Sequence, residues 1–578
     1  MRCSMSAKAS GRKAMGLDDA RSAAAAGAGL VRRTWAASLI APDVDAGEGT
    51  RASFVASTFD VPEGAAPRLF ISAQGLYRAF VNDVRVGQDV LTPGWTCYDD
   101  RIAYQTYDLA GLVRPGENRI EIWLADGWYR SPLMWGAHPI ANCWGDRIAA
   151  LAEIVAGDTV LCATGPDWQS GLLPILKSGI YWGEDHDAGL PPEPSGGVTE
   201  LPTDPHLFVA HETAPVRELP PLAPVDSWTD GGARLHDFGQ NIAGYVRLTA
   251  SGAAGATVTV DFAEVLGPDR AFDNRNYRTA RARLTYRLAG GGAETWAPMF
   301  TFMGFRYARI TIDGDAEVTE IAAIPITSVP ERAGGFTCGV EAVNRLVENT
   351  VWSQRGNFIE IPTDCPQRDE RLGWTGDAQV FTGTACWLAD SERFLRKYLR
   401  DVMHDQRADG GVPHFAPDPT RRPNNTFPGD WAGSTGWGDV ITVTPWQLYL
   451  HYGDDSVLRE CFTAMLKWLD YLWSISDGPI IHPHAKWGQK GFSFGDWLQP
   501  VGDNRKPRPT IGDDCAATLY HAISTDLAAK VARVIGQEAE AERLEARAAE
   551  IRAAFTAEYF SASGRLAHND QTSYSLAS

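Results

Sequence analysis

Hydrophobic residues repeat with two different periods along the chain. Before about residue 330, short apolar or alternating runs recur between clusters of turn residues, as in Leu69–Ile71, Tyr77–Val81, Arg119–Leu124 and Val258–Phe262. Short strands separated by turn residues at regular intervals are typical of antiparallel β-sandwiches. A loose stretch rich in proline and glycine, 190–205, predicts a boundary near residue 200. We therefore expect two successive β-sandwich domains.

Beyond about residue 331 the spacing of hydrophobic residues becomes helical. One helical face carries Val343, Val347 and Val351. The same spacing predicts seven helices, at about 340–356, 377–389, 391–405, 439–452, 455–474, 515–535 and 537–558. Successive helical hairpins of this size suggest a toroid of helix pairs. Two long connections, 406–438 and 475–513, are rich in Trp, Gly, Pro and Asp and are candidate functional loops.

These patterns divide the chain into four segments. We expect a mobile leader over 1–45, a β-sandwich over 46–200, a second β-sandwich over 201–330 and a helical domain over 331–578. The leader's apolar run, 23–30, consists almost entirely of Ala and Gly, so it does not resemble a secretory signal peptide.

Charge and cysteine usage exclude several classes of protein. The 578 residues include 53 Lys+Arg and 72 Asp+Glu, a net charge of −19, which argues against general binding to nucleic acid or to anionic membranes. No stretch of about 18 apolar residues predicts a membrane span. The nine cysteines form no CxxC pair, which fits reduced thiols and a cytoplasmic location. No zinc, nucleotide or nicotinamide motif occurs in a fitting context, so we expect no metal and no cofactor.

The densest group of candidate functional residues lies in the segment DCPQRDERLGWTGD, 364–377. It contains four carboxylates, two arginines and one tryptophan: Asp364, Asp369, Glu370, Asp377, Arg368, Arg371 and Trp374. Proline and glycine disfavour a continuous helix here, so we expect a loop that enters a helix near Ala378. Crowded carboxylates have pKa values that are pushed apart, so one of them can stay protonated and act as a general acid.

A purely structural ion network is the alternative interpretation of this segment. Asp377 is well placed to cap the next helix. Arg368 and Arg371 could pair with Asp364 and Asp369 without any role in chemistry. Cys365 beside a proline is most simply a small packed residue.

The segment DCPQRDERLGWTGDA, 364–378, closely resembles the signature of bacterial α-L-rhamnosidases, glycoside hydrolase family 78. Other segments are similar to the same family from about residue 50 to the end of the chain. They are 75–109 and 117–130 for its N-terminal β-sandwich, 178–188 for the stretch that follows, and 236–248, 262–266 and 300–310 for its second β domain. GWGD at 436–439 and GDWL at 495–498 resemble loops of its catalytic domain.

The resemblance implies an (α/α)6 catalytic domain that hydrolyses terminal α-L-rhamnose with inversion, acting on rhamnosylated glycosides or oligosaccharides. Glu370 matches the family's general acid. Four positions match residues that hold the rhamnose hydroxyls: Asp364, Arg368, Asp369 and Asp377. Three tryptophans are candidates for the apolar wall of the sugar site: Trp374, Trp437 and Trp497. For the last two, a role in anchoring the core or a loop is an equal alternative, and Asp439 could cap the helix after GWGD.

An inverting glycosidase also needs a general base, at roughly 6.5–9.5 Å from the acid. The resemblance implies that this base lies beyond residue 578, so we expect the toroid to be incomplete in this chain. Glu360 is a possible substitute, although a position at the end of a strand or helix fits it better. The alternative function is a catalytically impaired rhamnose-binding protein, and another (α/α)6 glycosidase or lyase is a third reading.

Overall fold

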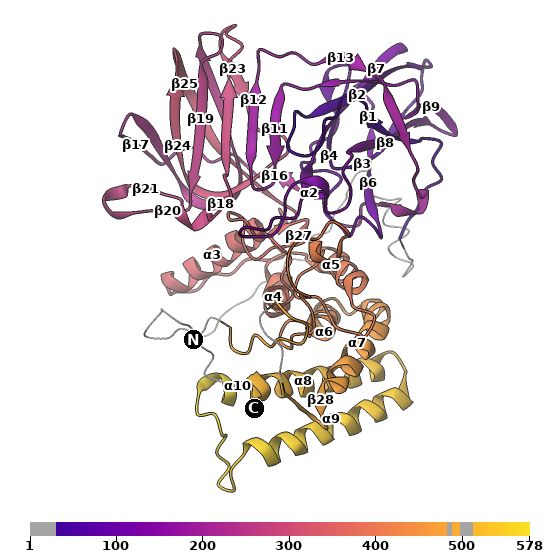
Figure 1. Cartoon of the computed structure of the whole chain (residues 1–578), viewed down its shortest axis with the longest axis vertical. Coiled ribbons are helices and arrows are strands. Elements are labelled where there is room, and N and C mark those ends of the chain that lie inside the picture. Colours follow the sequence, from indigo (N-terminus) through magenta and orange to yellow (C-terminus); the bar gives the residue numbers. More distant parts are fainter. Residues whose placement is uncertain (1–29, 483–487, 498–512) are drawn as a thin grey trace. The chain divides into compact units, whose positions relative to one another are not determined.

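The computed structural model describes residues 30–482, 488–497 and 513–578. They divide into two compact units. The first unit comprises the described residues up to Arg371 together with Arg422–Thr426, and the second comprises Leu372–Arg421 and Phe427–Ser578. The first unit holds the principal β-sheets and the second holds most of the helices (Figure 1).

The N-terminal part of the first unit consists of two sheets that share one hydrophobic core. The seven-stranded sheet has the order β14-β1-β8-β3-β6-β15 with β9 beside β8, and the six-stranded sheet has the order β13-β10-β2-β7-β4-β5. On β7, Ile120, Ile122 and Leu124 are buried and alternate with less buried residues, as the period of two predicts. The strands are β1 Leu39–Pro42, β2 Ser53–Val61, β3 Arg68–Gln74, β4 Leu76–Val81, β5 Val84–Arg85, β6 Ile102–Asp108, β7 Gly116–Ala125, β8 Ala149–Ala156, β9 Thr159–Ala163, β10 Gln169–Leu172, β13 Glu193–Gly196, β14 Val198–Leu201 and β15 Phe208–Ala210, and the short helix α2 is Gly127–Arg130.

The expected mobile leader reaches too far into the chain. Residues 1–29 lie outside the described part, but Leu39–Pro42 form the fully buried strand β1, which pairs with β14 and β8. Arg33 also forms an ion pair with the buried Glu153 on β8. The ordered β part therefore begins before residue 45.

A third sheet, of ten strands, crosses the expected boundary at residue 200. Its order is β11-β12-β22-β19-β24-β18-β25-β16, with β17 and β23 beside β18. It therefore recruits β11 and β12 from before that boundary, whereas β15 beyond it returns to the first pair of sheets. The ten strands of this sheet are β11 Ile175–Gly179, β12 Gly183–Asp187, β16 Arg217–Glu218, β17 Asp226–Asp230, β18 Ala233–Gly252, β19 Thr257–Ala263, β22 Arg283–Arg287, β23 Glu294–Trp296, β24 Met303–Asp313 and β25 Ala316–Thr327. A separate two-stranded sheet is formed by β20 Val265–Leu266 and β21 Phe272–Asp273.

Gly183 explains how β12 can join this sheet. It pairs with Arg283 in the parallel β12–β22 ladder. Its φ of +100° lies in the left-handed region, and a Cβ at this position would lie 1.9 Å from the carbonyl oxygen of Arg283. Only glycine permits so close an approach of the two backbones.

All seven helices that the periodicity predicts are present. They are α3 Glu341–Asn357, α4 Thr375–Leu388, α5 Glu392–Asp405, α6 Val440–Tyr452, α7 Ser456–Ser474, α8 Asp513–Val534 and α9 Glu538–Tyr559; α10 Gln571–Ala577 follows them. The two-residue strands β26 Phe358–Ile359 and β27 Ile361–Pro362 follow α3, and β28 Ser476–Asp477 and β29 Ile480–Ile481 follow α7. The mixed β and helical composition is thus confirmed, while the (α/α)6 toroid, incomplete in this chain, and the two separate β-sandwiches stay predictions.

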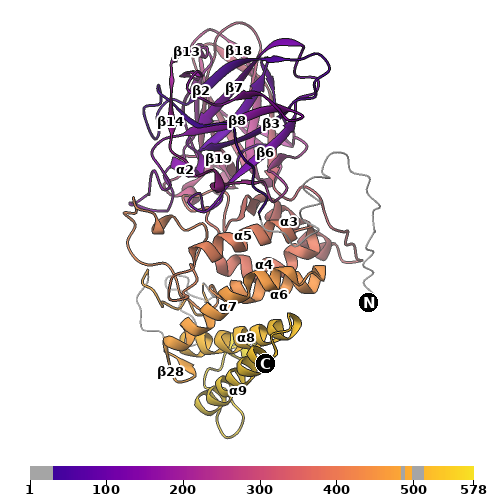
Figure 2. The same ribbon diagram turned by 90° about the vertical axis from the view of Figure 1, so that its right-hand side faces the viewer.

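Within the second unit, each helix from α5 to α8 contacts the next helix along the chain, and alternate helices also contact one another. Contacts join α4 to α6 and α6 to α8, while α5 contacts α7 and α8 runs beside α9 (Figure 2). Helix α5 shows why: its buried face carries Phe394, Tyr398 and Val402, and its other face presents Arg396 and Arg400 to Glu460 of α7. Successive hairpins therefore pack through one apolar face and one charged face.

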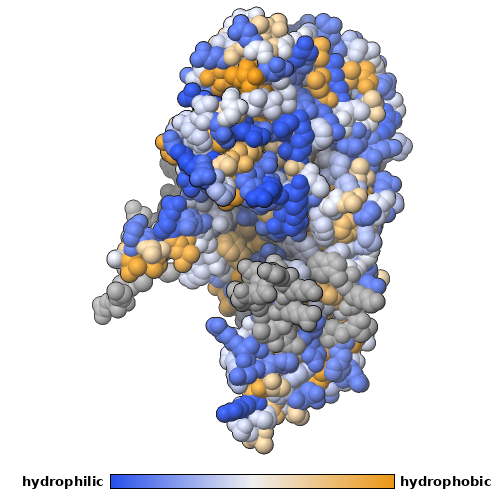
Figure 3. Space-filling view, turned by 60° about the vertical axis from the view of Figure 1, so that its left-hand side comes forward, coloured by the Kyte–Doolittle hydropathy of each residue, from blue (hydrophilic) through white to orange (hydrophobic). Residues whose placement is uncertain are grey.

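The surface mixes hydrophilic and hydrophobic residues. On the face drawn in Figure 3, the hydrophobic residues form separate patches between hydrophilic ones. Among the described residues, no helix combines the length and the apolar composition that crossing a membrane requires.

Candidate active site

The signature segment lies between β27 and α4, as the proline and the glycines predict. Helix α4 begins at Thr375, with Trp374 as its N-cap residue. Asp377 lies in the first turn of α4 rather than at the cap, so the capping interpretation of Asp377 was wrong. The boundary between the two units falls between Arg371 and Leu372. The candidate carboxylates 364–370 therefore belong to the first unit, and Trp374 and Asp377 belong to the second.

Asp369 and Glu370 are two neighbouring buried carboxylates, with exposed fractions of 1% and 8%. The Oδ2 atom of Asp369 accepts hydrogen bonds from the backbone N–H of Gly136, at 3.1 Å, and from the Thr279 hydroxyl. The Oε2 atom of Glu370 accepts from Nε of Arg368 at 2.8 Å and from Nη1 of Arg278 at 3.0 Å. Both carboxylates are thus held by groups that come from distant parts of the sequence.

Arg368 connects two of the predicted carboxylates. Besides its bond to Glu370, it donates from Nη2 to Oδ2 of Asp364 at 2.8 Å. Partial burial alone would lower the pKa of Arg368, but attraction to the carboxylates of Glu370 and Asp364 raises this pKa overall. The structure therefore brings Asp364, Arg368, Asp369 and Glu370 together in one cluster.

The ligand atoms of Asp364, Cys365 and Glu370 lie within 4.8 Å of one another, a spacing that a metal ion could bridge. The guanidinium of Arg368 already bonds to two of these three groups, so a cation occupies the position between the carboxylates. Burial raises the pKa of the Cys365 thiol well above its usual range, which keeps the thiol protonated and a poor ligand or nucleophile.

Arg371 anchors this segment to the β part of the first unit. It is buried, and Nη1 donates to the carbonyl oxygens of Ile180, at 2.8 Å, and Phe302, at 2.7 Å. The Tyr181 hydroxyl donates to the carbonyl oxygen of Glu370 itself. Arg371 thus binds backbone carbonyls, whereas sequence reasoning considered an ion pair with a neighbouring aspartate.

Sequence reasoning missed the partners that reach the carboxylates from the β part. These are Gly136, Tyr181, Arg278 and Thr279, which lie 90 or more residues before their partners. Tyr181 lies in the segment 178–188, which is similar to the family. Arg278 lies in an arginine-rich stretch, 275–283, but nothing in its spacing indicates a carboxylate partner nearly a hundred residues later.

The three predicted tryptophans converge on one residue in the second unit, Phe494. Trp437 stacks on the Phe494 ring with centroids 4.0 Å apart, and the ring centroids of Trp374 and Trp497 lie 6.1 and 5.4 Å from it. The indole N–H of Trp437 is buried and has no hydrogen-bond partner among the described residues. Trp497 is 46% exposed. The three predicted tryptophans therefore share one aromatic cluster, and sequence reasoning did not identify its central residue, Phe494.

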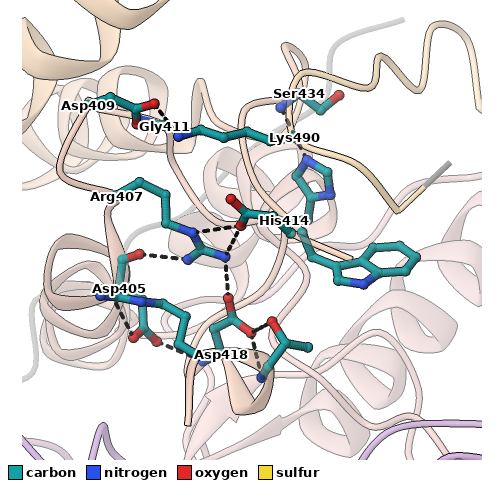
Figure 4. Close-up of polar contacts among 12 residues, drawn as sticks. Asp405, Arg407, Asp409, Gly411, His414, Asp418, Ser434 and Lys490 are labelled. Carbon is teal, nitrogen blue, oxygen red and sulfur yellow. Dashed lines mark hydrogen bonds and ion pairs between the residues drawn. The ribbon is translucent and has the colours of Figure 1, made fainter. Parts of the chain in front are cut away.

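A buried histidine supports this aromatic cluster. The His414 carbonyl accepts hydrogen bonds from Thr375 at the start of α4, and Nε2 of His414 accepts from the backbone N–H of Ser434 at 3.2 Å (Figure 4). The Ser434 hydroxyl in turn accepts from the backbone N–H of Phe494 at 3.3 Å. Burial, and then the nearby Arg407, lower the pKa of His414 to about 3, which keeps Nε2 available as an acceptor.

The loop 406–438 owes its conformation to ion pairs around Arg407. This guanidinium donates to Asp418 at 2.8 Å and to Asp430 at 2.8 and 2.9 Å (Figure 4). Asp418 also receives two hydrogen bonds from Thr420, and its backbone N–H donates to Asp405. The ion pairs of Arg407 with the buried Asp418 and the half-exposed Asp430 thus help to hold the long loop, beside its backbone hydrogen bonds.

Asp439 occupies the N-cap position of α6, but its side chain does not cap the helix. Its carboxylate accepts hydrogen bonds from the backbone N–H of Gly436 at 2.6 Å, from the Trp468 indole at 3.0 Å and from the Ser524 hydroxyl. Burial raises the pKa of Asp439 to about 6. The GWGD segment is therefore joined to α7 and α8.

Glu360, the possible substitute base, lies in the turn between β26 and β27. It is buried, and its φ of +65° is in the left-handed region. Its carboxylate packs directly against Gly94, where a Cβ would lie 2.2 Å from Oε2, and it lies 3.7 Å from His211. These neighbours belong to the N-terminal sheets and their loops.

Three family models match consecutive parts of the chain. An alpha-L-rhamnosidase N-terminal domain matches residues 63–195, a bacterial alpha-L-rhamnosidase concanavalin-like domain matches 228–327, and a bacterial alpha-L-rhamnosidase 6 hairpin glycosidase domain matches 331–577.

Curated relatives of the chain are also named alpha-L-rhamnosidase. An alpha-L-rhamnosidase from Streptomyces avermitilis is 37% identical to the chain, over 94% of the chain and 52% of the relative. One from Formosa agariphila is 33% identical, over 91% of the chain and 57% of the relative. The chain thus spans about half the length of the curated relatives it matches.

Solved structures agree with these sequence matches. The Streptomyces avermitilis alpha-L-rhamnosidase complexed with L-rhamnose superposes with a TM-score of 0.82 at 36% identity, over 91% of this chain and 50% of that one. The native rhamnosidase from Aspergillus terreus gives a TM-score of 0.86 at 31% identity, over 94% of this chain and 64% of that one.

Proposed function

The chain belongs to the bacterial α-L-rhamnosidase family, glycoside hydrolase family 78, and we propose that it carries the acid side of an active site that hydrolyses terminal α-L-rhamnosides. The observation that carries the proposal is the cluster of buried carboxylates around Arg368, in which Glu370 and Asp369 lie side by side. The substrates we propose are rhamnosylated glycosides or oligosaccharides.

Glu370 is the proposed general acid, which donates a proton to the glycosidic oxygen as the bond to rhamnose breaks. This task needs a carboxyl group that is fixed in position and shielded from bulk water. The position of the Glu370 carboxyl group is fixed by the guanidiniums of Arg368 and Arg278 and by the hydrogen bond that Tyr181 donates to the Glu370 backbone. Burial shields this carboxyl group from bulk water.

The remaining predicted residues have proposed roles in binding. Asp364, Arg368, Asp369 and Asp377 hold the rhamnose hydroxyls, since carboxylates and guanidiniums make charge-assisted hydrogen bonds to sugars. The cluster around Phe494 offers flat apolar surfaces for the sugar ring and its methyl group: Trp374, Trp437 and Trp497. The reaction we propose inverts the anomeric centre, with a general base that follows residue 578 in sequence and lies roughly 6.5–9.5 Å from the acid.

We further propose a cytoplasmic location. The eight cysteines in the described part of the chain are free thiols, and six of them are buried, which is the usual state in a reducing compartment. Cell fractionation with an antibody against the chain would test it, and recovery in the secreted fraction would contradict it.

Replacement of the acid tests the proposed function directly. We expect Glu370→Gln to lower the rate of rhamnoside hydrolysis by about 10²–10⁴-fold, because the amide cannot donate a proton to the leaving oxygen. The rate is measured with a natural rhamnoside and with p-nitrophenyl α-L-rhamnopyranoside, whose good leaving group reduces the loss. Glu317→Gln, an exposed glutamate on β25, is the matched control.

The assay is run on this chain and on a longer form that extends beyond residue 578, beside calorimetric binding of L-rhamnose. Activity of the longer form alone supports a base beyond residue 578. Binding of L-rhamnose without hydrolysis by either form would favour the alternative, a rhamnose-binding protein. Full activity of Glu370→Gln on the natural rhamnoside would refute the assignment of the acid.

A further inference from the structure

Four arginines between 275 and 283 share a stretch of the first unit but have different partners. Arg275 pairs with Asp273 at 2.6 Å, Arg281 with Asp185 at 2.9 Å and Arg283 with Asp261 at 2.6 Å. Arg278 is different, because it pairs with the two candidate site carboxylates. Its Nη1 atom lies 3.0 Å from Oε2 of Glu370 and 3.9 Å from Oδ1 of Asp369.

The guanidinium of Arg278 is far more accessible than the carboxylates it contacts. The Arg278 side chain is 45% exposed, whereas the side chains of Glu370 and Asp369 are 11% and 2% exposed. Its contacts in the described part of the chain are made through Nη1, which leaves Nε and Nη2 without a hydrogen-bond partner there. Arg278 therefore contacts a buried carboxylate through Nη1, while its Nε and Nη2 donors are accessible to a ligand.

The backbone at Arg278 is held in an unfavourable conformation. Its φ of +58° and ψ of −116° lie in a region that residues with a Cβ rarely adopt. Two neighbouring contacts maintain it: the backbone N–H of Arg278 donates to the carbonyl of Arg275, and the buried Tyr277 hydroxyl donates to Gly304. The surrounding structure thus directs this side chain toward the carboxylates at a cost in backbone energy.

The position of a general acid determines what lies near Arg278. The acid must approach the glycosidic oxygen to about 2.6–3.2 Å. Arg278 and Arg368 both donate to Oε2 of Glu370, so the proton is transferred from Oε1 of the same carboxyl group, and the Arg278 guanidinium is within about 8 Å of the glycosidic oxygen. The first ring of the leaving group is bonded to this oxygen, so it is the part of the substrate that comes near Arg278.

With Glu370 protonated, the net charge of the cluster does not repel an anion at this place. When Glu370 carries its proton, the charges of Asp364, Asp369, Arg368 and Arg278 cancel. The accessible guanidinium of Arg278 then has free donors in the fork geometry that matches a carboxylate. A neutral hydroxyl in the same place would gain a weaker hydrogen bond.

We propose that Arg278 is a specificity-determining residue that favours rhamnosides whose leaving group carries a carboxylate next to the glycosidic oxygen, as a 4-linked uronic acid does. The inference rests on the proposed function, because it requires Glu370 to be the acid that faces the leaving group. It adds the chemical class of the leaving group and the residue that selects it.

The test compares two disaccharides that differ only at C6 of the leaving sugar, which is a carboxylate in one and a neutral hydroxymethyl group in the other. Binding of α-L-rhamnosyl-(1→4)-D-glucuronate and of α-L-rhamnosyl-(1→4)-D-glucose to the full chain is measured by calorimetry, with L-rhamnose alone as reference. We expect the wild-type chain to prefer the uronate by about tenfold, the lower end of what a charge-assisted contact gives, because Arg278 is partly exposed. The preference should decrease as ionic strength rises.

Arg278→Gln should abolish this preference, measured as the ratio of the two disaccharide affinities, and Arg278→Lys should retain part of it. Arg275→Gln is the matched control, since Arg275 lies in the same stretch but pairs with Asp273; it should keep the full preference. If a form of the protein hydrolyses the disaccharides, the same ratio is taken from kcat/KM.

The outcomes separate this inference from the proposed function. L-Rhamnose binding together with equal affinity for the two disaccharides, or with a uronate preference that survives in Arg278→Gln, overturns the role of Arg278 alone. Absence of L-rhamnose binding in folded wild-type protein overturns the proposed function and this inference together.

Discussion

Glu184 and Glu370 are both buried glutamates, but they lie in opposite electrostatic surroundings. Glu370 receives two guanidiniums at Oε2. Glu184 on β12 instead accepts hydrogen bonds from the backbone N–H groups of Met299 and Phe300, at 3.0 and 3.2 Å, and its Oε1 has no hydrogen-bond partner among the described residues. Burial raises the pKa of Glu184 to about 7, so this carboxyl group stays protonated under mildly acidic conditions.

Glu184 should make the folded state less stable as pH rises. Its folded pKa of about 7 lies above the ordinary glutamate value of 4.5, so the folded state binds its proton more tightly than the unfolded state does. The stabilisation that this proton-binding difference gives to the folded state is fully present below about pH 4.5 and is lost as pH rises through 7. The loss lowers the free energy of unfolding by about 3 kcal/mol.

The variant Glu184→Gln keeps the shape of the side chain and an acceptor for both N–H groups, but it does not titrate. Compared with wild type, it should gain stability as pH rises from 5 to 8, and the two should converge at low pH. Urea unfolding at a series of pH values measures this difference. Parallel stability curves across the range would contradict the buried, neutral state of Glu184.

At the scale of elements, helix α4 connects the signature to the aromatic cluster through a glycine. A Cβ at Gly376 would lie 2.7–2.9 Å from three atoms of the Trp437 indole. Trp437 can therefore stack on Phe494 only because position 376 has no side chain.

Gly376→Ala should displace Trp437 and weaken any binding that uses it. We expect overpacking to cost about 1–3 kcal/mol, more than the roughly 1 kcal/mol that alanine gains in helix propensity. The matched control is Gly383→Ala on the same helix, where the nearest atom to a new Cβ is 3.5 Å away; this variant should be neutral or stabilising. Near-ultraviolet circular dichroism reports the change at Trp437, and calorimetry with L-rhamnose reports binding. An unchanged aromatic signal in Gly376→Ala would show that Trp437 does not depend on this glycine.

The elements that sequence predicts best are those with local signals. The helices follow from periodicity, because each buries one face of a continuous segment, as α5 does with Phe394, Tyr398 and Val402. Sheet membership does not follow, because the pairing of β12 with β22 depends on residues a hundred positions apart, Gly183 and Arg283.

The candidate site divides in the same way. Its carboxylates stand in one contiguous motif, 364–377, so sequence identifies them together. Their partner Arg278 and the central ring Phe494 have no motif of their own, and only the fold brings them to the residues they contact.

At the scale of the whole molecule, the compact unit that holds the β-sheets continues beyond the change of periodicity near residue 330. The first unit continues to Arg371, and α3, β26, β27 and the carboxylate segment belong to it. Arg371 explains this extension, because its buried guanidinium donates to the carbonyls of Ile180 and Phe302 within the same unit. A domain boundary drawn at the change of periodicity therefore separates the carboxylates from the residues that hold them.

This continuity predicts which fragment of the chain folds most stably. We expect residues 30–371 to unfold in a cooperative transition with a higher midpoint than residues 30–330, because the shorter fragment loses the buried guanidinium and leaves two buried carbonyls without their donor. Both fragments lack Arg422, which pairs with Asp99 at 2.6 Å, so that loss is common to them. Arg371→Leu in the longer fragment isolates the contribution of the anchor and should remove part of the gain. Thermal unfolding followed by circular dichroism gives the midpoints. Equal midpoints would mean that the carboxylate segment adds nothing to the stability of the β part, and that its position depends on the helical unit instead.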